Sequence, residues 1–157
     1  MSLHDAAREG DLEALRDRIA RGDDVDGRGG GGATPLMEAC INDHLECAQA
    51  LINARAAVDM VNNNGETALM RACYSGHHEC AQALIDAGAA VDRVDIYGDT
   101  VLMRACDKRD DECTRVLVDA GAAVDKASKA GWTALMTTSA LGHHDCARAS
   151  IDAGAAV

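Results

Sequence analysis

The chain has 157 residues, which is enough for one domain of ordinary size and too few for two. It carries 26 acidic and 15 basic residues, a formal net charge of −11, and this negative surplus argues against binding to nucleic acids or anionic membranes. There is no Phe, one Trp and two Tyr, so the core must be built from small and aliphatic side chains and seven cysteines. The N-terminal stretch is charged throughout, unlike a signal peptide, and no segment has the apolar length of a membrane span.

The spacing of the cysteines indicates an internal repeat. The gaps between successive cysteines alternate between 7 and 26 residues, which add up to a period of 33, and the last gap is 33 itself; the residues are Cys40, Cys47, Cys73, Cys80, Cys106, Cys113 and Cys146. An odd cysteine count without an export signal favours reduced thiols over a disulfide framework. We therefore expect an intracellular protein, cytoplasmic or nuclear.

The rest of the sequence follows the same period. The segments GATPLMEAC, GETALMRAC, GDTVLMRAC and GWTALMTTS begin at residues 32, 65, 98 and 131, and the N-terminal stretch fits weakly. The period predicts a single domain, residues 1–157, of five units: 1–31 as an N-terminal cap, 32–64, 65–97, 98–130, and 131–157 as a C-terminal cap.

Each unit is predicted to form two short helices. Thr67 is a suitable N-cap, and the apolar residues Leu69, Ala72 and Cys73 follow it on one helical face. Gly88 supplies the left-handed conformation that commonly ends a helix. Helices of about ten residues are unstable alone in water, so each unit must pack against its neighbours.

This pattern resembles the ankyrin repeat family. Thr34-Pro35-Leu36 matches the start of the T-P-L-H-x-A signature, and the period is the family's own. Gly76-His77 and the ending Gly88-Ala89-Ala90-Val91-Asp92 fit the family pattern further. The resemblance implies a mainly α-helical ankyrin-repeat solenoid, with helix-turn-helix units joined by β-hairpin-like loops, and a non-catalytic role in binding other proteins.

One departure from the signature concerns its histidine, which is replaced by methionine in four units: Met37, Met70, Met103 and Met136. We expect these thioethers to replace the family's histidine hydrogen bonds by packing. A second feature concerns the ends of the array. Polar residues stand there in positions that are apolar elsewhere, namely Arg18, Thr138, Ser139 and Ser150, so both ends are predicted to be capped.

Residues that vary between units at exposed positions are the candidates for partner binding. In this family the hairpin tips and the outward side of each first helix line a concave groove, and all three aromatic residues fall in this set. Tyr, Trp and Arg are enriched at interface hot spots. The predicted partner-binding residues are Arg71, Tyr74, Ser75, Ile96, Tyr97, Asp99, Arg104, Asp107, Lys108 and Trp132.

The two arginines of this set, Arg71 and Arg104, have two possible roles. One role is to bind a carboxylate of the partner, and the other is to pair with Glu38 and Asp107 of this chain.

The sequence gives less support to functions other than protein binding. His77-His78-Glu79-Cys80, repeated at residues 143–146, is a possible zinc-ligand or thiol-responsive set, but the third unit breaks it with Asp110-Asp111. The tract Gly29–Gly32 lacks the Lys of a phosphate loop and falls at an expected hairpin tip. We expect no enzymatic activity, metal or cofactor, and a monomer whose partner is another protein; a structural or regulatory arm of a larger protein is a further alternative.

Overall fold

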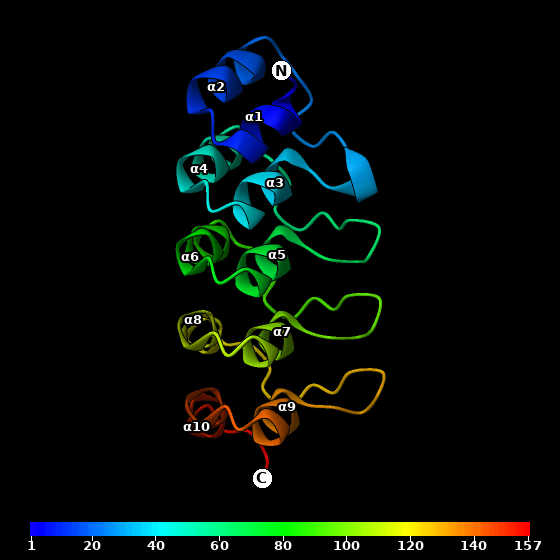
Figure 1. Ribbon diagram of the computed structural model, residues 1–157, viewed down its shortest axis with the longest axis vertical. Coiled ribbons are helices and arrows are strands. Elements are labelled where there is room, and N and C mark those ends of the chain that lie inside the picture. The colour runs from blue at the N-terminus through cyan, green and yellow to red at the C-terminus, as the bar shows by residue number, and fades with distance from the viewer.

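The computed structural model describes all 157 residues as five stacked helix pairs (Figure 1). The pairs, numbered first to fifth, are α1 (Leu3–Glu9) with α2 (Leu12–Ala20), α3 (Pro35–Ile41) with α4 (Leu45–Asn53), α5 (Ala68–Tyr74) with α6 (His78–Asp86), α7 (Val101–Asp107) with α8 (Asp111–Asp119), and α9 (Ala134–Leu141) with α10 (His144–Asp152). The first helices form one column and the second helices another, and a long loop projects beside the first helices before each next pair (Figure 1).

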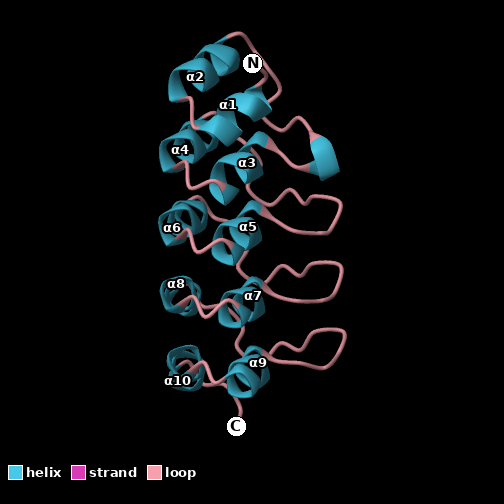
Figure 2. Ribbon diagram, viewed as in Figure 1, coloured by secondary structure: helices cyan, strands magenta, loops and turns pink.

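The loops contain no β-strand (Figure 2). One isolated bridge joins Val94 to Thr100, and a short 3-10 turn, η1, spans Gly30–Gly32. The fold is therefore the all-helical solenoid that the sequence predicts, with loops that turn like hairpins and form almost no ladder.

Threonine side chains start four of the five first helices. Thr34, Thr67, Thr100 and Thr133 accept a hydrogen bond from the backbone amide three residues later, at 3.2 to 3.3 Å. This bond satisfies one of the amides that a helix N-terminus leaves unpaired. The predicted N-cap at Thr67 is confirmed, and Gly88 follows α6 in the left-handed region with φ of 90°.

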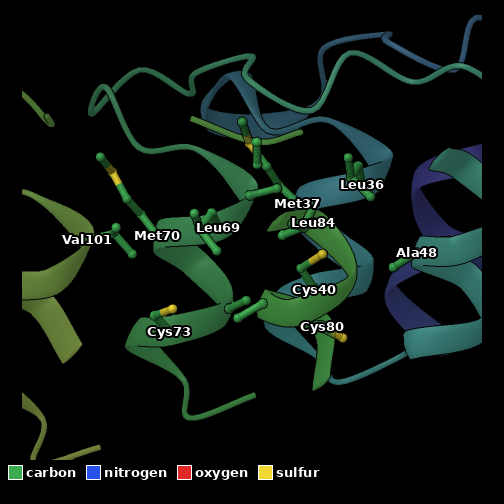
Figure 3. Close-up of a cluster of buried hydrophobic side chains, with 14 of the residues drawn as sticks. Leu36, Met37, Cys40, Ala48, Leu69, Met70, Cys73, Cys80, Leu84 and Val101 are labelled. Carbon is green, nitrogen blue, oxygen red and sulfur yellow. The ribbon is translucent and has the colours of Figure 1, made fainter. Parts of the chain in front are cut away.

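The core runs between the helix pairs along the whole stack. Met37, Met70 and Met103 are at most 4 % exposed, and Figure 3 shows Met70 beside Val101, a residue of the next pair. The prediction that the thioethers pack in place of histidine is therefore confirmed for these three. It is wrong for Met136, which is 52 % exposed because no helix of the described residues packs on that side of α9.

All seven cysteines are buried free thiols, and six of them meet in twos across neighbouring helix pairs. Cys40 contacts Cys80 of the next pair, and Cys73 contacts Cys113 in the same way. Figure 3 shows Cys40, Cys73 and Cys80 among the aliphatic side chains of the core. These paired cysteines fill small spaces between successive helix pairs.

Histidines link three of the four joints between pairs. His44 Nε2 lies 3.0 Å from the carbonyl oxygen of Arg8, and His77 Nε2 lies 3.1 Å from that of Ile41. His143 Nδ1 makes the corresponding bond to the carbonyl oxygen of Cys106 at 2.8 Å.

The joint between the third and fourth pairs has Asp110 in place of the histidine. One oxygen of this carboxylate, Oδ1, caps α8 by accepting from the amide of Cys113 at 3.0 Å. The other, Oδ2, is buried without a hydrogen-bond partner. This joint therefore lacks the side-chain link that the other three have.

The two ends of the stack differ. At the N-terminal end Arg18 forms an ion pair with Asp23 at 2.7 Å, as suits a polar cap. At the C-terminal end Thr138 and Ser150 are completely buried inside the fifth pair, so their polar groups do not cover its outer surface. Of the three polar residues predicted there, only Ser139 is exposed. The prediction of a C-terminal cap built from Thr138 and Ser150 is wrong because both side chains bond to backbone carbonyls within their own helices.

Candidate protein-binding face

Three of the four projecting loops have a tip that is shaped by one polar side chain. Asp95 Oδ1 accepts hydrogen bonds from the amides of Tyr97 at 2.9 Å and Asp99 at 3.0 Å. Asn62 holds the preceding tip through the same two bonds, and Ser128 Oγ accepts from the amide of Trp132 at 3.3 Å. Side chains that accept from backbone amides a few residues on fix a turn locally. The tips therefore have defined conformations without a β-ladder.

Backbone hydrogen bonds also connect successive tips. The amides of Asn63, Ile96 and Lys129 donate to carbonyl oxygens of the preceding tip, at 2.9, 3.1 and 3.1 Å. The ammonium group of Lys129 adds a bond to the carbonyl oxygen of Ile96 at 2.7 Å. The tract Gly29–Gly32 forms the first tip, in agreement with its interpretation as a turn. The tips thus form one connected row along the stack.

Large apolar side chains stand on the last two tips of this row. Tyr97 is 61 % exposed, and Trp132 and Ile96 are nearly half exposed. Val94 is exposed to the same degree as Ile96 and is not among the residues predicted from the sequence. Because the tips are held by their own hydrogen bonds, these side chains are presented to solvent by an ordered backbone.

The arginines of the first helices are already paired within the chain. Arg71 bonds to Glu66 at 3.2 Å, and the guanidinium of Arg104 contacts Asp95, with Nε 3.2 Å from Oδ2, and Asp99 at 3.5 Å. Neither arginine pairs with Glu38 or Asp107, so this one of the two possible roles is contradicted. The acidic partners lie on the tip beside each helix, where the loop folds back over the arginine.

Burial and neighbouring charges shift the pKa values of Asp99 and Arg104 in opposite directions. Burial raises the pKa of Asp99, and the positive charge of Arg104 only partly offsets this effect. Burial also tends to lower the pKa of Arg104, but the hydrogen bond to Asp95 and the neighbouring carboxylates raise it. Arg104 therefore stays protonated, and the carboxylates of Asp95 and Asp99 balance its positive charge.

The remaining predicted residues lie at the other end of the first helices. Tyr74 and Ser75 end α5, and Asp107 and Lys108 end α7. The ammonium group of Lys108 lies 4.3 Å from the centre of the Tyr74 ring, a cation–π geometry. With Asp110 and its neighbours, Tyr74, Ser75 and Lys108 line a polar cleft of about 590 Å³.

The ten predicted residues therefore form two groups. Ile96, Tyr97, Asp99, Arg104 and Trp132 gather at the tips with Arg71, while Tyr74, Ser75, Asp107 and Lys108 lie at the helix ends. A seven-residue helix is about 10 Å long, and this length separates the two groups. We call the two groups together the binding face.

Asp95, which shapes the tip and also neutralises Arg104, is not among the residues predicted from the sequence. Its signal was present, since Asn62, Asp95 and Ser128 stand 33 residues apart and all favour turns. Their variation in residue type hid the common role.

The sequence also suggested a zinc or thiol-responsive site at the cysteines and histidines. No group of three or more His, Cys, Asp or Glu side chains gathers in a metal-binding arrangement. Burial raises the pKa of Cys106 to about 11 and that of Cys146 to about 12. The Sγ atoms of these two residues lie 4.0 and 3.4 Å from the hydroxyl oxygen of Thr114, which lies between them. Cys106 and Cys146 therefore remain protonated near neutral pH, and a protonated thiol is a poor nucleophile and a poor metal ligand.

A stack of helix pairs, each contacting only its neighbours, defines a helical repeat protein. The family model described as ankyrin repeats (3 copies) matches residues 3–95 and 88–156. The chain therefore belongs to the ankyrin repeat family.

A similar curated protein is described as a putative ankyrin-containing lipoprotein of Leifsonia xyli subsp. xyli. It is 58 % identical over 38 residues, a stretch that covers 24 % of this chain and 15 % of that protein. None of the helices in the present structure combines the length and the apolar character needed to cross a membrane.

Proposed function

We propose that the protein is a non-catalytic module that binds another protein through the binding face. Ankyrin repeats are generally protein–protein interaction modules, and the family assignment covers the chain. The observation that carries the proposal is the exposure of Tyr97 and Trp132 on neighbouring tips whose backbones are hydrogen-bonded to each other. Ordering these side chains before binding lowers the entropy cost of association.

The ion pairs of the binding face indicate what kind of contact it makes. Arg71 and Arg104 are neutralised by carboxylates of their own tips, so neither offers an unpaired charge to a partner. The exposed groups are instead the aromatic and aliphatic side chains at the tips and the Tyr74–Lys108 pair at the helix ends. Binding is therefore expected to depend mainly on apolar burial, with weak dependence on salt.

Replacing Tyr74, Tyr97 and Trp132 together by Ala tests the proposal. The wild-type and variant proteins are used as bait, and captured proteins are quantified by mass spectrometry. We expect the variant to lose the partner enriched by the wild type, because the three largest exposed contacts are gone. Far-ultraviolet circular dichroism should show unchanged helix content, since none of the three is buried.

A matched control lies on the opposite column of helices. Gln49, Gln82 and Arg115 occupy equivalent exposed positions of the second helices, and their triple replacement by Ala should leave capture intact. Capture that survives the aromatic triple variant, or that is lost in the control, contradicts the proposed face.

The absence of catalysis and the intracellular location are parts of the same proposal. The seven free thiols support a reducing compartment, whereas the relative from Leifsonia xyli is described as a lipoprotein. Fractionation of cells that express the native gene, with detection by antibody, tests the location. Recovery with the membrane or secreted fraction would exclude it.

A further inference from the structure

Side chains link successive helix pairs at three of the four joints, counted from the N-terminus. At the first joint, between the first and second pairs, Arg8 pairs with Glu38 at 3.1 Å beside the bond that His44 makes. At the second joint, His77 bonds to a backbone carbonyl oxygen and also lies 3.6 Å from the carboxylate of Asp43. These contacts tie each helix pair to the one before it.

The fourth joint is linked in the same way. The thiol of Cys146 donates to Asp111 Oδ1 at 3.0 Å, and His143 bonds to the carbonyl oxygen of Cys106 at 2.8 Å. These three joints therefore each have a histidine bond and a further polar contact between helices of neighbouring pairs.

The helices of the third joint lack such links. Asp110 stands in the position of the bonding histidines, and its Oδ1 accepts from the amide of Cys113 in its own helix pair. Its Oδ2 is buried without a partner, and a carboxylate has no hydrogen to donate to a carbonyl oxygen of the preceding pair. Apart from the contact between Cys73 and Cys113 and the cation–π pair at the helix ends, apolar packing joins α5 and α6 to α7 and α8.

The turn between α7 and α8 also weakens the fourth pair. Arg109 has φ of 56° there, in the left-handed region, where the turns of three other pairs have Gly10, Gly76 and Gly142. Glycine adopts this conformation readily, and a short polar residue such as Asp43 does so at moderate cost, whereas a long side chain is disfavoured. The fourth pair is therefore both weakly linked to the third and less stable in itself.

Bonds between the loops do not distinguish the third joint. The amide of Ile96 donates to the carbonyl oxygen of Asn64 there, at 3.1 Å, and the amides of Asn63 and Lys129 make the equivalent bonds at the second and fourth joints. The joints therefore differ in the contacts between their helices. Because each pair contacts only its neighbours, the stack parts first at the joint with the weakest interface.

The third joint crosses the binding face. Tyr74 ends α5 on one side of it and Lys108 ends α7 on the other, so their cation–π contact spans the joint. Tyr97 belongs to the loop beside α7, since the acidic residues of its tip pair with Arg104 of that helix (Figure 1). Trp132 stands one loop further on. Separation at the third joint thus divides the exposed aromatic residues into two sets.

We propose that the stack opens reversibly at the third joint, so that the fourth and fifth pairs unfold as one unit while the first three pairs stay folded. Three pairs are enough for a stable stack, whereas two pairs released from it bury too little surface to stay folded. A partner that contacts both parts of the binding face binds only the closed stack and holds the joint shut. This consequence for binding rests on the proposed function, whereas the opening itself is a property of the chain alone.

Native-state hydrogen exchange, followed by mass spectrometry of peptic fragments at low urea concentrations, tests the opening without any partner. Backbone amides of α7 to α10 should exchange at one common rate, about tenfold faster than those of α3 to α6, with the change falling between α6 and α7. Exchange of the whole stack as one unit, a gradual change along it, or a boundary at another joint would overturn the proposal.

Two variants that act on the third joint should slow the exchange of α7 to α10. Asp110→His supplies the missing link to the preceding pair, and Arg109→Gly relieves the turn while Asp110 stays in place. Each variant should reduce the tenfold difference between the two parts of the stack to about threefold or less. A difference that stays unchanged in both variants would contradict the proposal.

His143→Asp is the matched control, because it places the same residue type at the fourth joint. It should accelerate exchange in α9 and α10 and create a second boundary between α8 and α9. Acceleration spread evenly over α7 to α10 would mean that the residue at the joint does not set the boundary, and the proposal would fail.

Discussion

The carboxylate of Asp95 lies beneath the loop tip and pairs with the guanidinium of Arg104, directly beside the most exposed aromatic residue of the chain, Tyr97. The Arg104 guanidinium also lies 5.9 Å from the centre of the Tyr97 ring. One buried side chain therefore couples the shape of a tip to the charge balance of the binding face.

Asp95→Ala should destabilise the protein by about 3 kcal/mol, because two amides and a half-buried guanidinium lose their acceptor. Asp95→Asn should cost clearly less, since Asn62 holds the equivalent tip with an amide oxygen. Urea unfolding followed by circular dichroism measures both. Equal losses for the two variants would show that the turn bonds contribute little.

Asp110→His should stabilise the protein by about 1 kcal/mol. The imidazole would supply the missing link to the preceding helix pair and remove the unpaired Oδ2, at the cost of the cap on α8. There is space for the imidazole ring, because the side chain of residue 110 faces Gly76. In the same way, the ring of His44 faces Gly10. Thermal unfolding measures the gain, with His77→Ala as a control that should lower the midpoint; a lower midpoint for Asp110→His would contradict this account.

Stability should fall as the pH rises above 9. Below that value Cys106 and Cys146 are protonated in both the folded and unfolded states, so they cause no pH dependence. Between pH 9 and their folded pKa values of about 11 and 12, the unfolded chain releases protons that the folded chain retains. Each thiol then contributes a loss of at most about 1.4 kcal/mol per pH unit.

Urea unfolding at several pH values between 8 and 11 measures this slope. Cys106→Ala/Cys146→Ala should reduce the slope, whatever its effect on stability at pH 8. A slope identical to that of the wild type would assign the alkaline loss to other groups.

Two glycines of the first tip should respond differently to alanine. Gly32 has φ of 75°, and a Cβ there would lie 2.5 Å from the side-chain oxygen of Asn63, so Gly32→Ala should cost about 2 kcal/mol. Nothing lies within 4 Å of a Cβ at Gly30, so Gly30→Ala should change the unfolding free energy by less than about 1 kcal/mol. Chemical unfolding of the pair of variants compares them directly, and equal effects would contradict the ordered first tip.

The repeat period, the helix pairs and their threonine caps were all predictable from the sequence. These features depend on contacts within a few residues, such as the bond from the Met70 amide to Thr67 Oγ1, which a local pattern encodes. The candidate binding residues were selected from the sequence because they vary where the scaffold repeats, and their role in binding stays a prediction.

Only the tertiary structure decided which residues meet across joints. The partners of Arg104, the contact between Cys40 and Cys80 and the unpaired oxygen of Asp110 depend on how neighbouring pairs stack. The four methionines show the reason most clearly. Met103 and Met136 occupy the same position of the repeat, yet one is 4 % and the other 52 % exposed, because burial depends on the neighbour that covers a residue and not on the residue itself.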